Sequence, residues 1–258
     1  MRTVHVRGVP VATPSREELS AIVRTWITSE ARAYVSCASV HLIELGHGAP
    51  EVRDALCAAD LVLADGAPVA WAARWLGGDA VNRITGSDVF ELLSSEPGSF
   101  YRHFFYGSTP AVLDHLVVNV RAEFPEAVIA GAYSPPFVDD VEEDATGLDM
   151  INAAQPDIVW VGLGAPKQDL WMHANRGKLD AAVLIGVGAV FDFVAGTRRR
   201  APTWMRRRGV EWLFRLAEEP RRLWRRYLVT NTTFVLGVVG ELGRRGWRGD
   251  VSSRKDRT

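Results

Sequence analysis

Short apolar runs alternate with longer amphipathic segments along most of this chain. The run Ile158–Val161 is apolar at every position, as a parallel strand covered on both faces must be, and Leu61–Leu63 has the same character. Further strands are predicted over Ala33–Ser36, His103–Tyr106, Val128–Ala130 and Ala182–Gly186. Helices are predicted over Thr13–Glu30 (opened by a capping box at Ser15 and Glu18), Val40–Leu45, Glu51–Ala59, Val69–Leu76, Asp88–Ser94, Ala111–Phe124, Val141–Ala153 and Lys167–Arg176. Such repeated strand–turn–helix units indicate an α/β fold, with a Rossmann-like, mostly parallel sheet flanked by helices.

The character of the chain changes after Gly196. Two helices are expected there, Pro202–Ala217 and Arg221–Val235, with arginines on one side and aromatic residues on the other. We therefore expect an α/β core over residues 1–196, a basic helical appendage over 197–242, and a polar, disordered tail over 243–258.

Composition narrows the class of protein. With 258 residues, 47% hydrophobic and 24% charged, the chain resembles an ordinary soluble globular protein. No window approaches the ~20 apolar residues that a membrane span needs, and the N-terminus lacks the apolar stretch of a signal peptide. The two cysteines, Cys37 and Cys57, suit a reduced, cytoplasmic compartment.

The net charge of −1 conceals a strongly basic segment. Between Arg198 and Tyr227 there are eleven arginines and three glutamates, an excess of about eight positive charges. The segment could bind nucleic acid, lie on an anionic membrane, or reflect a general preference for arginine, since the chain has 27 Arg and 3 Lys. Tryptophans on the same helices favour a membrane interface, because Trp and Arg both suit the headgroup layer, but these aromatics could also form a packed core stripe.

A glycine turn follows the apolar strand Ile158–Val161. Gly162 and Gly164 permit a tight turn, and Pro166 suits the first turn of a helix. The expected product is a helix N-terminus whose free N–H groups point into the crevice at the carboxyl edge of the sheet, where phosphates bind. Lys167 and Gln168 lie where they could touch such a ligand, so we expect a nucleotide-type substrate.

Other candidates lie at the same edge of the predicted sheet. Asp65, followed by Gly66, comes directly after a buried strand and could accept a proton, or it could cap the next helix. Arg83 precedes a predicted helix and could hold a diphosphate, although such an arginine is often merely on the surface. Asp192 could accept from a base or ribose hydroxyl, or satisfy a backbone N–H. Gly107 opens the turn after His103–Tyr106.

Several familiar signatures are missing from the sequence. Neither glycine turn completes the G-x-G-x-x-G of a dinucleotide site, and there is no P-loop. The six histidines have no metal-ligand spacing, and there is no Asp-x-Asp pair. We therefore expect no cofactor and no metal. A diphosphate would have to be stabilised by helix N-termini and arginines.

Together these segments resemble the WecG/TagA/CpsF glycosyltransferase family over roughly Tyr34 to Tyr227. The blocks that carry the resemblance are Ala59–Gly66, Arg83–Asp88, Gly162–Trp171, Gly186–Gly196, Arg200–Trp204 and Glu211–Arg222. The family's usual Thr-x-Asn after the first strand is replaced by Ser36-Cys37-Ala38. The hydroxyl is kept, so the resemblance implies that Ser36 contacts the substrate, whereas Ala38 cannot hydrogen-bond a sugar amide or hydroxyl.

The resemblance implies an inverting transfer from a UDP-sugar, of the UDP-N-acetylmannosamine type, to a polyprenol-diphosphate-linked N-acetylglucosamine. It implies a peripheral enzyme on the inner face of the cell membrane, serving cell-surface polysaccharide synthesis. Asp65 would be the general base, and Arg83 and Gln168 would hold the diphosphate and donor sugar. Asp192 would lie near the uridine, and the basic appendage would complete the site. Arg198 and Arg200 could also meet the charge of UDP.

Two other classes of protein stay open on the sequence. A nicotinamide-dependent Rossmann oxidoreductase shares the predicted architecture. A non-enzymatic module could use the Arg198–Tyr227 segment to bind membranes or nucleic acid. We expect an anionic membrane and no nucleic acid as the partner of this segment. A homo-oligomer is left open.

Overall fold

The computed structural model describes residues 2–77, 82–136 and 144–255, without the side chains of residues 207, 222, 225, 226 and 245–255. Within these residues, eight strands form one sheet in the order β1-β2-β4-β3-β8-β7-β5-β6. The strands are β1 (Thr3–Val6), β2 (Val9–Ala12), β3 (Ala33–Ala38), β4 (Leu61–Ala64), β5 (Arg102–Gly107), β6 (Val128–Tyr133), β7 (Ile158–Gly162) and β8 (Val183–Gly186). Only the pairing of β1 with β2 is antiparallel in this sheet. The predicted α/β class with a mostly parallel sheet is confirmed.

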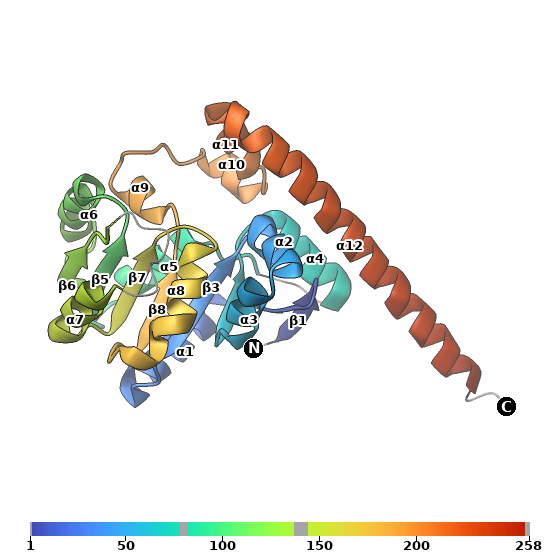
Figure 1. Cartoon of the computed structure of the whole chain (residues 1–258), viewed down its shortest axis with the longest axis horizontal. Helices are drawn as coiled ribbons and strands as arrows, with labels where there is room; N and C mark the ends of the chain where they lie inside the picture. The colour runs from blue at the N-terminus through green and yellow to red at the C-terminus, as the bar shows by residue number, and fades with distance from the viewer. Residues whose placement is uncertain (1, 78–81, 137–143, 256–258) are drawn as a thin grey trace.

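Helices cover both faces of the sheet (Figure 1). Their bounds are α1 (Arg16–Ser29), α2 (Val40–Gly48), α3 (Pro50–Ala58), α4 (Ala67–Gly77), α5 (Gly86–Ser94), α6 (Pro110–Glu123), α7 (Ala145–Ala154), α8 (Lys167–Asn175), a 3₁₀ turn η1 (Arg176–Lys178), α9 (Val190–Val194), α10 (Thr203–Arg207), α11 (Glu211–Glu218) and α12 (Pro220–Lys255). Helices α1, α5, α6 and α9 bury their apolar side chains against one face. Helices α2, α3, α7 and α8 cover the other face, joined by α4 and α12 beside the β1–β2 hairpin.

The central strands are buried on both faces, as their apolar runs predict. Along β7, Ile158 and Trp160 pack into one apolar cluster while Val159 and Val161 pack into another. In β4, Leu61 and Leu63 face one cluster, whereas Val62 faces the opposite one. Period-two alternation between two covered faces explains why no polar position interrupts these strands.

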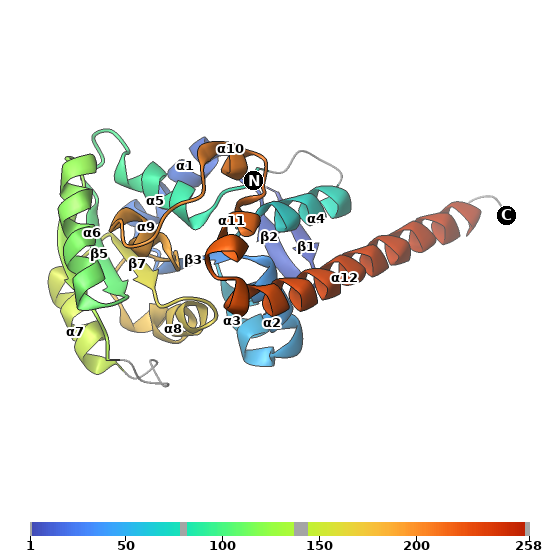
Figure 2. The same ribbon diagram turned by 90° about the horizontal axis from the view of Figure 1, so that it is seen from above.

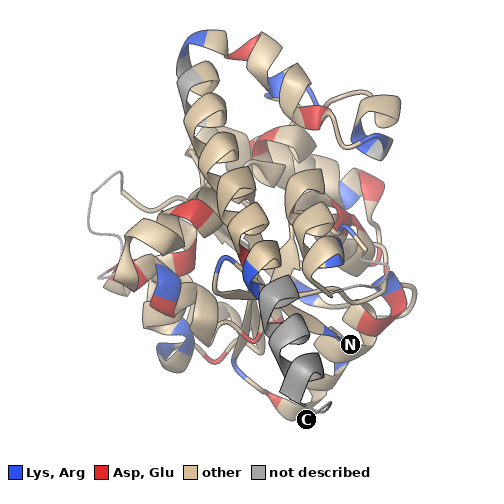
Figure 3. Cartoon of the chain, turned by 90° about the vertical axis from the view of Figure 1, so that its right-hand side faces the viewer, with Lys and Arg blue, Asp and Glu red and all other residues tan. Residues whose placement is uncertain are grey.

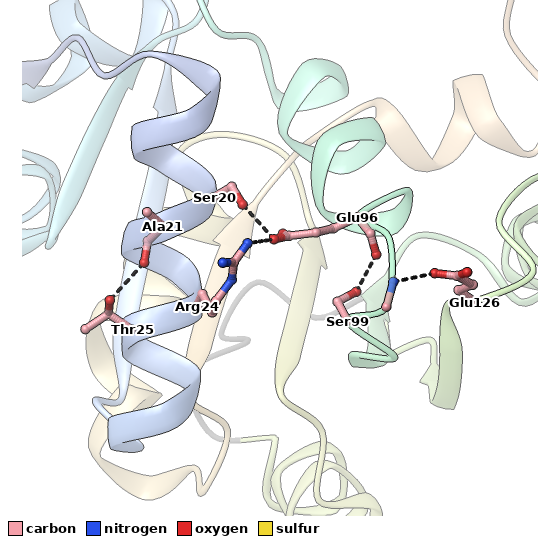
Figure 4. Close-up of polar contacts among 8 residues, drawn as sticks. Ser20, Ala21, Arg24, Thr25, Glu96, Ser99 and Glu126 are labelled. Carbon is pink, nitrogen blue, oxygen red and sulfur yellow. Dashed lines mark hydrogen bonds and ion pairs between the residues drawn. The ribbon is translucent and has the colours of Figure 1, made fainter.

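Hydrogen bonds at the helix ends fix several elements in place. The predicted capping box is confirmed: Glu18 N–H donates to Ser15 Oγ (3.1 Å) and Ser15 N–H donates to Glu18 Oε2 (2.8 Å). A second box, between Thr85 and Asp88, opens α5. After α5, Glu96 accepts from Ser20 Oγ (2.8 Å) and pairs with Arg24, which ties α1 to this segment (Figure 4). The contacts of Glu96 tie the end of α5 to α1, and the Thr85–Asp88 box fixes where α5 begins.

The structure differs from the sequence prediction at both ends of the chain. The N-terminal β1–β2 hairpin was not among the predicted strands. Beyond Pro202 there are three helices in place of two, and α12 continues to Lys255 through the segment from residue 243 that was expected to be disordered. No proline follows Pro220 to stop this helix. The first residues of the predicted helix Val141–Ala153 lie outside the described residues. No helix in the described residues has both the length and the apolar character needed to cross a membrane.

Candidate active site

Asp65 stands at the carboxyl edge of the sheet. Its own N–H donates to Ala38 O (3.1 Å), which places it between the ends of β3 and β4. Gly66 then adopts a φ of +119°, and α4 begins at once. Pro68, the second residue of α4, has no N–H for a cap, and the Asp65 carboxylate makes no hydrogen bond to this first turn among the contacts of the described residues. The carboxylate is therefore available to the adjoining cavity.

A cavity of about 370 Å³ opens where β3, β4, β7 and β8 end. Six of the residues predicted from the sequence line it: Asp65, Gly66, Arg83, Gly164, Gln168 and Arg198. Thr85, Gly86 and Ser87, at the N-terminus of α5, line it too, beside Arg83. An arginine next to a helix N-terminus is a favourable setting for a diphosphate.

The surroundings of Asp65 suit proton transfer near neutral pH. Burial raises the pKa of the Asp65 carboxyl to about 7; the positive charges of Arg215 and Arg83 oppose this rise, while Glu211 and Asp88 add to it. A carboxyl group with such a pKa is largely ionised slightly above neutrality and is still basic enough to accept a proton.

Gln168 reaches the cavity from α8 in a defined orientation. The Gly188 N–H donates to Gln168 Oε1 over 2.9 Å, so the amide NH₂ is left for a ligand. Behind it, Asp169 is fully buried and accepts from Ser36 Oγ over 2.6 Å. Burial raises the pKa of Asp169 to about 7, against the effect of the Ser36 hydrogen bond. Ser36 therefore supports α8 and does not line the cavity, while its neighbour Cys37 does.

The first turn of α8 is less open than the sequence suggested. The N–H of Gln168 bonds to Gly164 O (2.9 Å) and that of Asp169 bonds to Pro166 O (3.0 Å), so these two groups are not free to bind phosphate. Ala165 lines the cavity in place of Pro166, and Lys167 is outside its wall. A step of one residue along a helix turns the side chain by about 100°, so Lys167 and Gln168 cannot both face the ligand.

Two predicted glycines serve packing instead of binding. A Cβ on Gly107 would lie 2.7 Å from the carbonyl of Gly162, and one on Gly162 would lie 2.5 Å from the Phe191 ring. Neither glycine lines the cavity. The absence of side chains there lets neighbouring strands and α9 approach closely.

Asp192 and Arg200 also lie outside the cavity wall. The carbonyl of Asp192 accepts from Arg198 N–H (3.1 Å), so this residue shapes the loop that follows α9. Arg200 lies 3.9 Å from Asp88 on α5. Neither side chain lines the cavity. Of the loop after α9, Arg198 does line it, and its guanidinium also pairs with Glu219 (2.5 Å).

The appendage forms one wall of the cavity, which the sequence did not assign residue by residue. Glu211, Trp212 and Arg215 come from α11, and Tyr227, Thr230 and Asn231 come from α12. The guanidinium of Arg215 lies over the Phe193 ring, 5.4 Å from its centroid. Figure 2 shows α11 and the start of α12 lying over the ends of the central strands. The sequence predicts helices here, with arginines on one side and aromatic residues on the other. This pattern does not show which of these side chains face the cavity.

These features define an enzyme class: a Rossmann-like group-transfer enzyme whose base and cationic groups meet at the carboxyl edge of a parallel sheet. Within the described residues there is no group of three or more His, Cys, Asp or Glu side chains that could hold a metal ion.

Comparison with known proteins agrees with this class. Residues 4–248 match the glycosyl transferase WecG/TagA/CpsF family. The chain therefore belongs to the WecG/TagA/CpsF family and is a glycosyltransferase. This assignment decides against an oxidoreductase and against a non-enzymatic binding module.

Two curated relatives come from Bacillus, and both are named N-acetylglucosaminyldiphosphoundecaprenol N-acetyl-beta-D-mannosaminyltransferase. The Bacillus spizizenii protein is 38% identical over 180 residues, which is 69% of this chain and 68% of the relative. The Bacillus subtilis protein is 38% identical over 176 residues, covering 68% of this chain and 67% of the relative.

Proposed function

We propose that the chain transfers an N-acetylmannosamine-type sugar from its UDP derivative to N-acetylglucosamine linked to a polyprenol diphosphate. The acceptor class follows the names of the two Bacillus relatives, and the donor follows the cavity, where an arginine, an amide and a helix N-terminus converge. The observation that carries the proposal is that the Asp65 carboxylate lines the same cavity as Arg83, Gln168 and the N-terminus of α5.

The proposed reaction is a single displacement at the anomeric carbon. A hydroxyl oxygen of the acceptor forms the new bond to that carbon as its proton passes to Asp65, and the bond between the carbon and the UDP oxygen breaks. The electron pair leaves with UDP. Arg83, the amide of Gln168 and the first turn of α5 would stabilise the departing diphosphate, with Arg215 closing the site from α11. One displacement inverts the anomeric configuration.

The proposed setting is the inner face of the cell membrane, where a polyprenol-linked acceptor and a cytoplasmic sugar nucleotide can meet. The basic segment from Arg198 to Tyr227 supports attraction to anionic lipid. We also propose that the transfer needs no metal, because the sequence has no Asp-x-Asp pair and cationic side chains reach the cavity in its place.

A panel of UDP-sugars tests this proposal. Each would be incubated with the enzyme and a synthetic polyprenol-diphosphate N-acetylglucosamine, with UDP release and product mass as readouts. We expect acceptor-dependent release with UDP-N-acetylmannosamine and a product whose anomeric configuration is inverted by NMR. Release that does not depend on acceptor, or a product with retained configuration, would overturn the proposed reaction.

A further inference from the structure

Phe193 lines the cavity from α9, a short helix that is anchored in the core. Two residues before it, Phe191 is buried and packs edge-on against Phe105, with the ring centroids 5.8 Å apart. One residue after it, the carbonyl of Val194 accepts from Asn119 Nδ2 of α6 (2.8 Å). These contacts fix the backbone on both sides of Phe193. The half-buried ring therefore has a defined place in the cavity wall.

The Arg215 guanidinium lies over this ring. Its central carbon is 5.4 Å from the centroid of Phe193, within the range of a cation–π contact. Arg215 comes from α11, and Figure 3 shows basic and acidic residues mixed along the C-terminal helices at the top of the view. Among the contacts of the described residues, no ion pair or side-chain hydrogen bond holds this guanidinium, which leaves the ring to orient it.

A guanidinium that rests on an aromatic face keeps its hydrogen-bond donors. Its five N–H groups lie in the plane of the group, so contact through the flat face leaves them for a ligand. Arg215 lines the cavity together with Asp65, Arg83 and Gln168. The ring of Phe193 therefore presents a cation to the cavity without neutralising it, as a carboxylate partner would.

The pKa of Asp65 depends on where Arg215 stands. Burial is the largest influence and raises this pKa; of the nearby charges, that of Arg215 has the largest effect and lowers it. Arg83 also lowers the pKa, whereas Glu211 and Asp88 raise it, and Cys37 on β3 is a further titratable neighbour. A displacement of the Arg215 guanidinium would therefore raise the pKa of Asp65.

We propose that Phe193 is a positioning residue, which holds the Arg215 guanidinium between Asp65 and the place of the departing diphosphate. Phe193 acts through Arg215. The chemical purpose rests on the proposed function, since a cation in this place favours the ionised base and meets the charge that develops on UDP. Without the ring, the arginine side chain is free to turn into solvent, and both groups lose a positive charge.

Carbon-13 NMR of enzyme labelled at aspartate tests the proposal without donor or acceptor. The readout is the pKa of the Asp65 carboxyl, whose signal is assigned by its loss in Asp65→Asn. Phe193→Leu and Phe193→Met remove the ring, and Phe193→Tyr keeps it. Trp204→Leu is the matched control, because it removes another cation–π contact of the C-terminal helices. There, Arg208 lies 5.9 Å from the Trp204 ring centroid, and neither residue lines the cavity.

Phe193→Leu and Phe193→Met should raise the pKa of Asp65 by about half a pH unit or more, part of the shift of about one unit expected for Arg215→Gln. The double variant Phe193→Leu/Arg215→Gln should titrate like Arg215→Gln alone, because the ring acts through that guanidinium. Phe193→Tyr and Trp204→Leu should titrate like the wild type. The direction of the shift separates positioning from packing: a ring that only shields Asp65 from water would lower the pKa when removed, since burial raises it.

Transfer should respond to the same contact. With a pKa raised by about half a unit, kcat/KM of Phe193→Leu at pH 7 should lie about fourfold below its own plateau at high pH, against about twofold for the wild type. An unchanged or lowered pKa without the ring, an equal shift in Phe193→Tyr or Trp204→Leu, or a shift that persists in the Arg215→Gln background would overturn the proposal. If the carboxyl titrates as expected but no transfer occurs, the positioning stands and the proposed reaction fails.

Discussion

The two charged residues that α11 brings to the cavity should shift the pH dependence of the enzyme in opposite directions. Burial raises the pKa of Asp65 to about 7, with Arg215 lowering it and Glu211 raising it. If ionised Asp65 is the base, about half of the molecules are active at pH 7 and about one-tenth at pH 6. The wild-type kcat/KM should therefore fall about fivefold between these two values.

Arg215→Gln removes the positive charge that most favours the ionised carboxylate. Taking a shift of about one pH unit, the lower end of the effect of a nearby opposite charge, kcat/KM of the variant at pH 7 should lie about tenfold below its own plateau at high pH, whereas the wild-type value lies about twofold below its plateau. Glu211→Gln removes a negative charge, so its acidic limb should move to lower pH and its relative rate at pH 6 should rise.

The assay is UDP release measured from pH 5.5 to 9.5, and the readout is the midpoint of the acidic limb. Plateau heights are free to change, because both residues also line the cavity. Asp169→Asn is the control, since the pKa of Asp169 is also raised to about 7 but this carboxyl is buried behind Gln168 and bonded to Ser36. Its midpoint should stay in place. Equal midpoints for the two charge variants, or shifts in the same direction, would refute Asp65 as the titrating base.

Three further outcomes are expected. Because burial raises the pKa of Asp169 from 3.8 to about 7, its ionisation destabilises the fold as the pH rises through this interval; Asp169→Asn should reduce the fall in melting temperature between pH 5 and pH 8, and an unchanged fall would contradict this. Gly162→Ala should lower the melting temperature by several degrees, because overpacking against Phe191 costs about 1–3 kcal/mol, whereas Gly177→Ala, which meets open space, should leave it unchanged. Transfer should survive EDTA, and a loss restored by a divalent cation would count against metal-free chemistry.

Much of the sheet could be predicted because apolar runs such as Ile158–Val161 have few other stable environments. The glycines were harder to interpret. Gly107 and Gly162 are glycines because a side chain there would collide with neighbouring residues, whereas Gly164 lines the cavity. The sequence alone does not distinguish a glycine required for packing from one that lines a binding site. Periodicity likewise shows that the C-terminal helices are amphipathic, but the place where they dock depends on distant contacts such as the hydrogen bond from the Arg7 N–H to Glu241 Oε2 of α12.

The candidate site was predictable where a residue directly follows a buried strand. Asp65 is such a case, since the strand itself sets the position of its carboxylate. Lys167 and Asp192 were not predictable to the same degree, because a rotation of one helical step decides whether a side chain faces the cavity. The pairing of Ser36 with Asp169 joins positions far apart in the chain, so a hydroxyl expected at the substrate supports α8 instead.

The most direct test of the account is a paired measurement on Asp65→Asn: turnover with UDP-N-acetylmannosamine and the lipid-linked acceptor, and UDP affinity by calorimetry. The account predicts that kcat falls about 10²–10⁴-fold, the usual contribution of a general base, while the Kd for UDP changes by less than about twofold. Unchanged turnover, or a loss of UDP affinity that accounts for the lost activity, would contradict the assignment of Asp65 as the base.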